Sequence, residues 1–353
     1  MPVVEYAPKY FEALCGFVDR LGDRPALIHR PFVDYYYTTQ DWCRLYLYVG
    51  NDGTILATYG LDRMPFDYNG REMMIGFGSN FYSLQPGLGG VLFIHWHKAC
   101  PIGLVYGGSA DTHRMIRGRK WRFYNGVRMF VLNKPYQAHP GDGWLRVAAK
   151  SALRQTRRAN LSSYSSRIPA DIRARISIRE ERAFTEDLIP RESPFTFRLA
   201  APAHYLNWRY NTELSFIRYR LFRILNGGRT TGYVVFNESP EKLLVAHCDG
   251  MDAQTLAYGV VLGALEACRE DRQPRSVTLA SCHTAMQEIY QRIGFRSERT
   301  DRTFAVGTLG GPVDIEPNTS NWLVNFDWGD NGLRRPFLDE SSAQIGTRGN
   351  PRR

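Results

Sequence analysis

The sequence predicts an α/β protein of two similar lobes, each a mixed, mostly antiparallel sheet flanked by helices. Three observations support this prediction. First, one order of elements, a meander of strands followed by helix, strand, helix and strand, occurs on both sides of a polar linker. Second, an apolar strand in the first copy runs directly into a glycine-rich turn at residues 85–90. Third, 353 residues are long for one core and fit two domains.

The first predicted lobe covers residues 1–143. Apolar residues at helical spacing open it, and apolar residues alternate along 44–49, a strand that ends at a Gly-Asn-Asp-Gly hairpin turn. The run Tyr35-Tyr36-Tyr37 is expected to pack in the core or to line a cleft. The predicted elements are a helix over 6–21, strands over 44–49, 54–61 and 72–84, a helix over 91–98, a strand over 103–106, a helix over 111–118, and a long strand or strand pair over 122–132.

A basic helical connector is predicted over residues 144–190, with a loose serine-rich linker at 161–166. Between Trp144 and Arg182 it carries ten Arg and Lys residues against three acidic ones, a net charge of +7. A solvated helical surface and a docking surface for an acidic partner both fit this pattern.

The second predicted lobe covers residues 191–310, and Asp252 is placed to cap its long helix. Its predicted elements are strands over 222–225, 231–236 and 242–248, a helix over 252–268, a strand over 277–280, a helix over 283–293 and a closing strand over 304–309. Residues 311–353 form an aromatic segment and a flexible tail. Its aromatic residues, such as Trp322 and Trp328, are expected to pack back on a lobe.

Composition narrows the class of protein. The net charge of +10 favours an anionic partner, which could be coenzyme A, an acidic carrier protein, an acidic peptide, nucleic acid or a membrane surface. The six cysteines form no Cys-x-x-Cys pair, and His95 and His97 would lie on different faces of a helix, so no metal site is expected. No run is long enough to span a membrane and no signal peptide is visible, so a cytoplasmic location is expected.

The glycine-rich turn has the chemistry of a phosphate cradle. Glycines allow positive φ angles and remove side chains, so several N–H groups can face one anion beside the positive end of the following helix. The turn lacks the glycine spacing of a dinucleotide-binding turn and the Gly-Lys-Ser/Thr of a Walker loop. The pyrophosphate of coenzyme A remains as a ligand, and an ordinary tight turn is the alternative.

Both halves resemble the GNAT acyltransferase superfamily. The stretch Pro86-Gly87-Leu88-Gly89-Gly90-Val91-Leu92 is similar to the Arg/Gln-x-x-Gly-x-Gly/Ala turn, with Leu84 or Gln85 at its first position. Residues 283–295 are similar to the Asn-x-x-Ala-x-x-Leu-Tyr-x-x-x-Gly-Phe helix, with His283 and Met286 replacing its Asn and Ala. Residues 205–210 and 322–330 resemble tandem GNAT proteins of bacterial polysaccharide and natural-product gene sets.

The resemblance implies a sheet that splays around a CoA thioester. We expect the first lobe to hold the donor, because the second lobe has Met251-Asp252-Ala253-Gln254-Thr255 where the cradle should be, without glycines and with an acid. The first lobe in turn has Ile116 where the second has Tyr290. The expected donor-binding residues are Tyr82, Ser83, Leu84, Gln85, Gly87, Leu88, Gly89 and Gly90.

Acyl transfer to an amine requires a base, acting directly or through water. Glu72 is the candidate implied by the resemblance, and Asp111 and His113 are the alternatives; Tyr290 could protonate the thiolate if the second lobe is active. Each has a plain structural alternative: a solvated strand end, a surface helix residue or a core tyrosine. The adjacent pairs Cys282-His283 and His247-Cys248 make poor dyads, since neighbours on a strand point to opposite faces.

The sequence thus predicts an N-acyltransferase that moves an acyl group, with a fatty acyl group as the leading specific hypothesis. The donor would be acyl-CoA or an acidic acyl carrier protein, and the acceptor an amine of a peptide, amino acid or amino sugar. Natural-product, modified-peptide and polysaccharide pathways all fit, as do a monomer and a homodimer. A non-catalytic GNAT-like binding protein is the alternative, and a tRNA-dependent aminoacyl transferase is the second alternative, although no base-stacking motif supports RNA binding.

Overall fold

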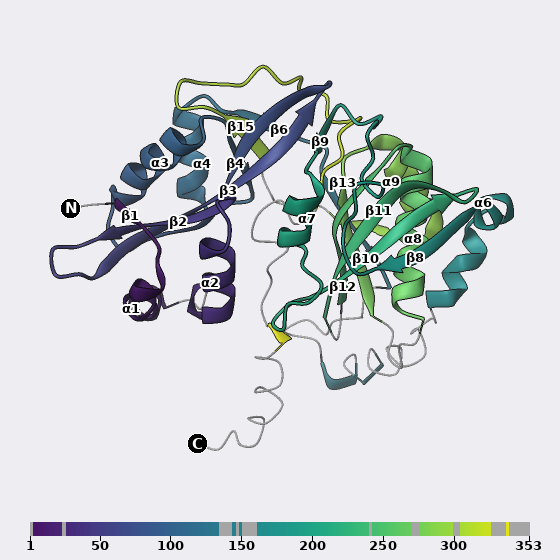
Figure 1. Cartoon of the computed structure of the whole chain (residues 1–353), viewed down its shortest axis with the longest axis horizontal. Coiled ribbons are helices and arrows are strands. Elements are labelled where there is room, and N and C mark those ends of the chain that lie inside the picture. The colour runs from purple at the N-terminus through teal and green to yellow at the C-terminus, as the bar shows by residue number, and fades with distance from the viewer. Residues whose placement is uncertain are drawn as a thin grey trace.

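The chain forms two α/β lobes that lie side by side, each built on one sheet (Figure 1). The structure is a computed structural model, and it describes residues 3–22, 26–133, 143–145, 148–149, 161–239, 242–269, 275–298, 304–325 and 337–338. The predicted two-lobed α/β architecture is confirmed. Most of the predicted helix after Trp144 lies outside the described residues. The same holds for the basic residues at 146, 150, 154, 157 and 158 and for the aromatic residues beyond 325 apart from Phe337.

The first sheet is antiparallel except between its fourth and fifth strands, which run parallel. In spatial order its strands are β1 (Val3–Glu5), β2 (Cys43–Val49), β3 (Ile55–Tyr68), β4 (Arg71–Ser83), β5 (Gly103–Tyr106), β15 (Phe304–Gly307) and β6 (Arg122–Tyr124), and β9 (Phe197–Leu199) pairs with β3 outside this path. The long β3–β4 hairpin turns at Asn69 and Gly70, which both have positive φ angles.

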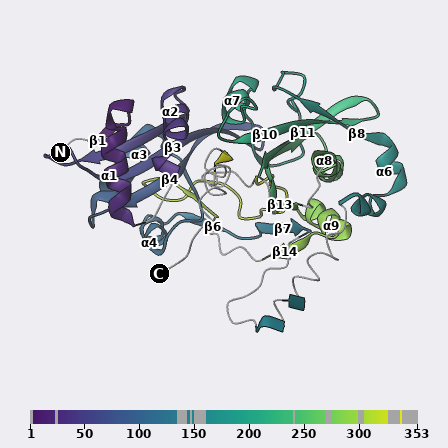
Figure 2. The same cartoon turned by 90° about the horizontal axis from the view of Figure 1, so that it is seen from below.

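Helices cover both faces of the first sheet. Helices α1 (Phe11–Leu21) and α2 (Arg30–Thr38) pack on one face, and α3 (Leu88–Ala99) and α4 (Ala110–Gly118) on the other. Figure 2 shows α1 and α2 on the side of the sheet opposite α4. Helix α2 was not predicted: the aromatic run belongs to it, and Tyr36 and Tyr37 form part of its buried face.

The second sheet has the same design. Its spatial order is β8 (Ile176–Glu181), β10 (Arg218–Asn226), β11 (Arg229–Glu238), β12 (Lys242–Gly250), β13 (Ser276–Ser281), β7 (Arg128–Leu132) and β14 (Arg296–Glu298), and only the β12–β13 pair is parallel. Helices α8 (Ala253–Ala267) and α9 (Thr284–Ile293) pack against one face. The predicted cap is confirmed, because the Asp252 carboxylate accepts the N–H groups of Gln254 and Thr255.

The two lobes exchange strands, with β9 lying apart from the main order of the first sheet. Strand β15, near the end of the second half, lies between β5 and β6, while β7, from the first half, lies between β13 and β14. The predicted strand region 122–132 is therefore divided between two sheets, and the predicted closing strand of the second half completes the first sheet. Each lobe needs a strand from the other half of the chain.

The lobes also share one hydrophobic core. It contains Val33 of α2 and Ile75 of β4 together with Leu221 and Val235 of the second sheet. Helix α7 (Ala203–Arg209) lies between the lobes (Figure 1) and contributes Leu206 to this core. Within the described residues, no helix is long and apolar enough to cross a membrane.

Candidate active site

Strands β4 and β5 part soon after they meet. They pair only at Gly76–Gly103 and Phe77–Leu104, where the glycines are required by close packing. A Cβ atom on Gly103 would lie 2.4 Å from the Trp121 ring and 2.7 Å from that of Trp96. Beyond Phe77 the edge of β4 that faces β5 is therefore open, as the predicted splay requires.

A β-bulge follows this point. In the β3–β4 ladder Gly60 pairs with Ser79 but Thr58 pairs with Tyr82, so β4 contains one extra residue. Within the bulge, Asn80 has a φ angle of +46°, which is uncommon for a residue other than glycine. The bulge therefore reshapes β4 along the stretch where its edge is open.

The glycine-rich turn connects this strand to α3. The Ser83 hydroxyl accepts the Gln85 N–H and donates to the Gln85 carbonyl, which fixes the start of the turn. Gly87 precedes α3 with a φ angle of +86°, and no side chain caps the helix. Gly89 has no room for a side chain, because a Cβ atom would lie 2.7 Å from the Phe81 ring. The Gly90 N–H donates to the Gly87 carbonyl, so the N–H groups of Leu88 and Gly89 are left for a ligand or water.

A cleft of about 560 Å³ opens at this turn. It contains seven of the eight predicted donor-binding residues; the eighth, Leu88, begins α3 beside it. The cleft is lined by Phe81, Tyr82, Ser83, Leu84, Gln85, Pro86, Gly87, Gly89, Gly90, Ser109, Asp111, Arg114 and Met115.

Arg114 is the lining residue that the sequence analysis missed. It lies on α4, one turn after Asp111, and the two exposed side chains form an ion pair with 3.0 Å between Nη1 and Oδ1. The guanidinium supplies a positive charge at the cleft. The glycine-rich turn lacks such a charge, because Leu84 or Gln85 stands at the first position of its motif. The spacing Asp111-x-x-Arg114 on a predicted helix was the available signal.

The predicted bases lie in different places. Glu72 is exposed near the hairpin turn, opposite Asp67, and Phe77 lies five positions further along the strand, roughly 16 Å away. Asp111 lines the cleft. His113 lies on the same helix, half-buried, with its Nε2 2.8 Å from the Gly107 carbonyl oxygen. Of the three, only Asp111 lines the cleft, and its exposed carboxylate lies on the wall formed by α4.

Tyr290 is a residue of the second core. It is 2% exposed and packs beside Phe130 and Phe295, and burial raises its pKa well above the usual range. Several aromatic side chains of the first lobe are also core residues, including Tyr36, Phe77, Phe93 and Trp96. Phe81 and Tyr82 instead line the cleft.

The second lobe has a matching splay, and a segment of the chain crosses it. Strands β12 and β13 pair only from Lys242–Ser276 to Leu244–Thr278 and then part. The buried segment 322–325 contacts β12 and the residue that follows β13. The Asn325 carboxamide accepts the Cys248 N–H at 2.9 Å and donates to the Cys248 carbonyl at 3.1 Å, while the Cys282 thiol, just after β13, donates to the Trp322 carbonyl.

We call residues 322–325 the plug. Asn325 is hydrogen-bonded to the edge of β12 in the second lobe. This edge is the counterpart of the open β4 edge in the first lobe. The environment of these cysteine and histidine residues does not favour a dyad: burial raises the pKa of Cys282 to about 12, and burial together with nearby arginines lowers the pKa of His247 to about 3. His283 packs its ring on Phe195 instead.

The sequence matches no protein-family model and no curated protein. The fold is similar to a probable N-acyltransferase from Enterococcus faecalis, with a TM-score of 0.54 and 8% identity over 87% of this chain and 72% of that chain. It is also similar to a GCN5-related N-acetyltransferase from Kribbella flavida, with a TM-score of 0.54 and 12% identity over 88% of this chain and 72% of that chain. A GCN5-related N-acetyltransferase from Anabaena variabilis has a TM-score of 0.53 and 9% identity over 87% of this chain and 72% of that chain. At these identities the likeness establishes the fold, which is that of the GNAT acyltransferases.

Among the residues described, no three His, Cys, Asp or Glu side chains gather as metal ligands. The pantetheine and phosphate groups of CoA need hydrogen-bond donors and positive charge instead of metal ligands. The open β4 edge, the uncapped start of α3 and the Arg114 guanidinium are donors suited to such a ligand.

Proposed function

We propose that the protein is a GNAT-type N-acyltransferase whose acyl donor binds in the first lobe. The observation that supports this most directly is the cleft in which an open strand edge, an uncapped helix start and the exposed Arg114 guanidinium meet. The donor, acyl-CoA or the phosphopantetheine arm of a carrier protein, supplies an activated acyl carbonyl. The acceptor is an amine of a peptide, amino acid or amino sugar.

Different parts of the cleft would bind different parts of the donor. The N–H groups at Leu88 and Gly89 and the Arg114 guanidinium face the phosphates, where the helix dipole adds to the attraction. The open edge of β4 beyond Phe77 offers backbone groups to the thioester end, where an N–H would stabilise negative charge on the carbonyl oxygen. Asp111 and His113 stay candidates for taking the proton from the amine, directly or through water.

The plug supports the first lobe as the donor site. In the second lobe the backbone polar groups of Cys248 are already paired with Asn325, which is 2% exposed. The helix that follows is capped by its own Asp252, so its first N–H groups are occupied and a negative charge stands beside them. An anionic donor therefore meets a helix start without a side-chain cap in the first lobe and one occupied by an acidic cap in the second.

Replacing Gly87 by alanine tests this assignment. Its φ angle of +86° suits glycine, so the alanine should distort the turn and weaken CoA binding about tenfold or more. Gly16→Ala in α1 is the matched control, because its Cβ atom meets nothing within 4 Å and it lies far from the cleft. Isothermal titration with CoA and acetyl-CoA measures both affinities.

Equal CoA affinity in both variants would move the donor site away from the turn. Absence of binding by any acyl-CoA or holo carrier protein to the unaltered protein would reject the donor site itself. A non-catalytic binding protein is the second candidate, favoured by the distance of Glu72 from the splay. Release of free thiol from acyl-CoA on addition of amines separates the two, because only the enzyme produces it.

A further inference from the structure

A buried polar network lies on the α2 side of the first sheet, behind the bulge of β4. Its centre is Asp62 of β3, which is 1% exposed. The Asp62 carboxylate accepts the Ser79 hydroxyl at 3.3 Å and the Tyr36 hydroxyl at 3.4 Å, and the Arg209 guanidinium lies 3.7 Å away. Burying a charge of this kind is costly unless several partners surround it, so the network is a specific arrangement.

A second arm of the network holds the bulge itself. The Asn80 side-chain amide donates to the Tyr37 hydroxyl at 2.7 Å, and the Thr58 hydroxyl donates to the Asn80 carbonyl at 2.9 Å. All three residues are buried. Consecutive residues Ser79 and Asn80 thus both direct their side chains to the α2 side, which fixes the extra residue of the bulge and its positive φ angle.

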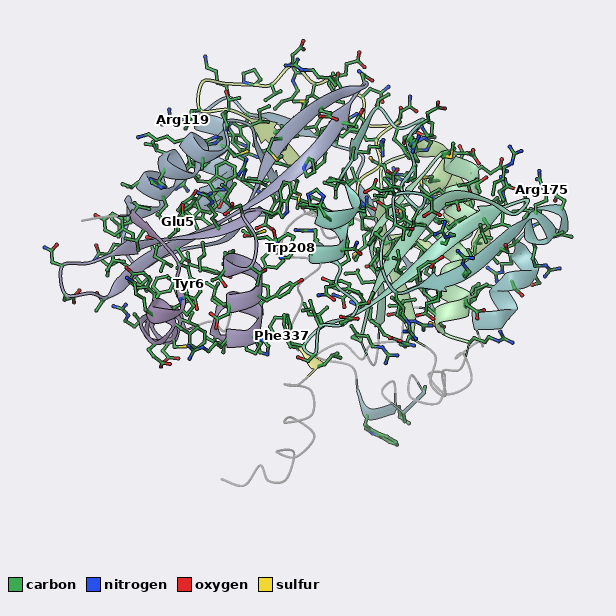
Figure 3. All side chains as sticks on the ribbon, viewed as in Figure 1. Glu5, Tyr6, Arg119, Arg175, Trp208 and Phe337 are labelled. Carbon is green, nitrogen blue, oxygen red and sulfur yellow. The ribbon has the colours of Figure 1, made fainter. Side chains whose placement is uncertain are left out.

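The second half of the chain completes the network. Arg209 ends α7, and its Nη1 donates to the Tyr36 hydroxyl at 2.5 Å. Helix α7 is held against α2 by two further hydrogen bonds, from the Tyr35 hydroxyl to the Trp208 carbonyl and from the Trp208 ring to the Thr39 hydroxyl. Figure 3 shows Trp208 between the lobes. Contacts from the second lobe therefore reach the bulge through α2.

Strain at a bulge persists only where the surroundings hold it, and such strain is typical of functional sites. Here the bulge lies where the edge of β4 is open, and the cleft is on the α3 and α4 face of the sheet, opposite the α2 face that holds the network. A shift of Asn80 would move the backbone that faces the donor. The network is therefore placed to set the geometry of that edge without touching the ligand.

We propose that Tyr37, Asn80 and Arg209 are positioning residues that hold the bulged edge of β4 in the geometry that receives the acyl carbonyl. The second half of the chain thereby contributes to the donor site of the first through Arg209. This inference rests on the proposed function of the cleft. It assigns a role to residues that do not touch the donor.

Paired tyrosine variants on α2 test the inference. Tyr37→Phe removes the partner of Asn80, whereas Tyr35→Phe removes a hydrogen bond to α7 and leaves the bulge intact. Titration with acetyl-CoA and with free CoA separates the effects, because only acetyl-CoA carries the acyl carbonyl. Tyr37→Phe should weaken acetyl-CoA binding about three- to tenfold and leave CoA binding unchanged, since one aligned hydrogen bond is lost. Tyr35→Phe should change neither affinity.

Asn80→Gly provides a second test in case the tyrosine variant folds poorly. Glycine tolerates the positive φ angle, so only the side-chain contact is lost, and the same selective loss of acetyl-CoA affinity is expected. Equal weakening of both ligands, or of neither, in variants that fold would overturn the positioning role. If the unaltered protein binds neither ligand, the proposed donor site fails instead, so the two failures are distinct.

Discussion

Arg114 is the single side chain that most changes the electrostatics of the cleft. Its guanidinium is the only positive side chain in the described lining, and its side chain is 80% exposed. Arg114→Gln should weaken CoA binding about two- to tenfold, because one charge-assisted contact to phosphate is lost. Arg117→Gln on the same helix is the control, since Arg117 lies over the Phe123 ring and does not line the cleft.

Titration calorimetry at two salt concentrations measures this difference. The effect of Arg114→Gln should shrink at high salt, because exposed charges are screened. Equal loss of affinity in both variants would show that the general positive charge of α4 attracts CoA, with no specific contact from Arg114.

Buried histidines should make the protein less stable in mild acid. Burial lowers the pKa of His97 to about 4 and, with nearby arginines, that of His247 to about 3. Unfolded histidines titrate near pH 6.5, so below that pH only the unfolded chain takes up these protons and the free energy of unfolding falls. Burial raises the pKa of Asp249 to about 6, which works in the opposite direction but only below about pH 6.

The net loss between pH 6.5 and 5.5 should be about 1–2 kcal/mol. Urea denaturation at the two pH values measures it. His247→Gln should reduce the pH dependence, whereas His204→Gln, which alters an exposed histidine on α7, should keep it. Stability that stays constant or rises as the pH falls would contradict the account.

The roles of single residues could be predicted from the sequence where they depend only on neighbours in the chain. The Asp252 cap and the cleft-lining glycines follow from residue types next to one another in the chain. Arg114 and Asp62 were missed because their roles depend on which helix and strand they face in space. The distance of Glu72 from the splay was not predictable, because the sequence shows where a strand begins but not where its neighbour leaves it, and β4 and β5 part after Phe77.

At the scale of elements, most helices and strands could be predicted from periodicity and turn residues. Helix α2 was hidden because its three consecutive tyrosines obscure the helical period. The exchange of β7 and β15 was not predictable, because each strand has the length and pattern of a closing strand in its own half. Only pairing between segments far apart in the chain decides which sheet each strand joins.

The plug makes a prediction at this scale. Asn325→Leu removes the partner of both the N–H and the carbonyl of Cys248, which are buried. The free energy of unfolding should fall by roughly 2–4 kcal/mol, since unsatisfied buried polar groups are costly. Asn318→Leu is the control, because that side chain is exposed and bonds only the nearby Ser320 N–H among the contacts described.

Urea denaturation measures the stability of both variants, and titration measures their CoA binding. Because the plug lies in the second lobe, Asn325→Leu should retain the CoA affinity of the unaltered protein at a temperature where it is folded. Loss of CoA binding by the folded variant would show that the second splay takes part in the donor site.

At the scale of the whole molecule, the two halves depend on each other. Each sheet includes a strand from the other half, and one core spans α1, α2, α7 and both sheets. Two buried ion pairs add to this dependence: Arg209 of the second half pairs with Asp62 of the first, and Arg198 of β9 in the first sheet pairs with Asp249 of β12 in the second sheet. The second lobe is therefore part of the framework that supports the cleft, even though its own splay is occupied.

Hydrogen exchange with and without CoA tests the central claim most directly, because it reports on both lobes in one experiment. CoA should slow exchange in peptides covering the β4 edge, the glycine-rich turn and the start of α3, residues 78–92, and leave residues 245–257 of β12 and α8 unchanged. Protection at 245–257 without protection at 78–92 would contradict the account and place the donor in the second lobe.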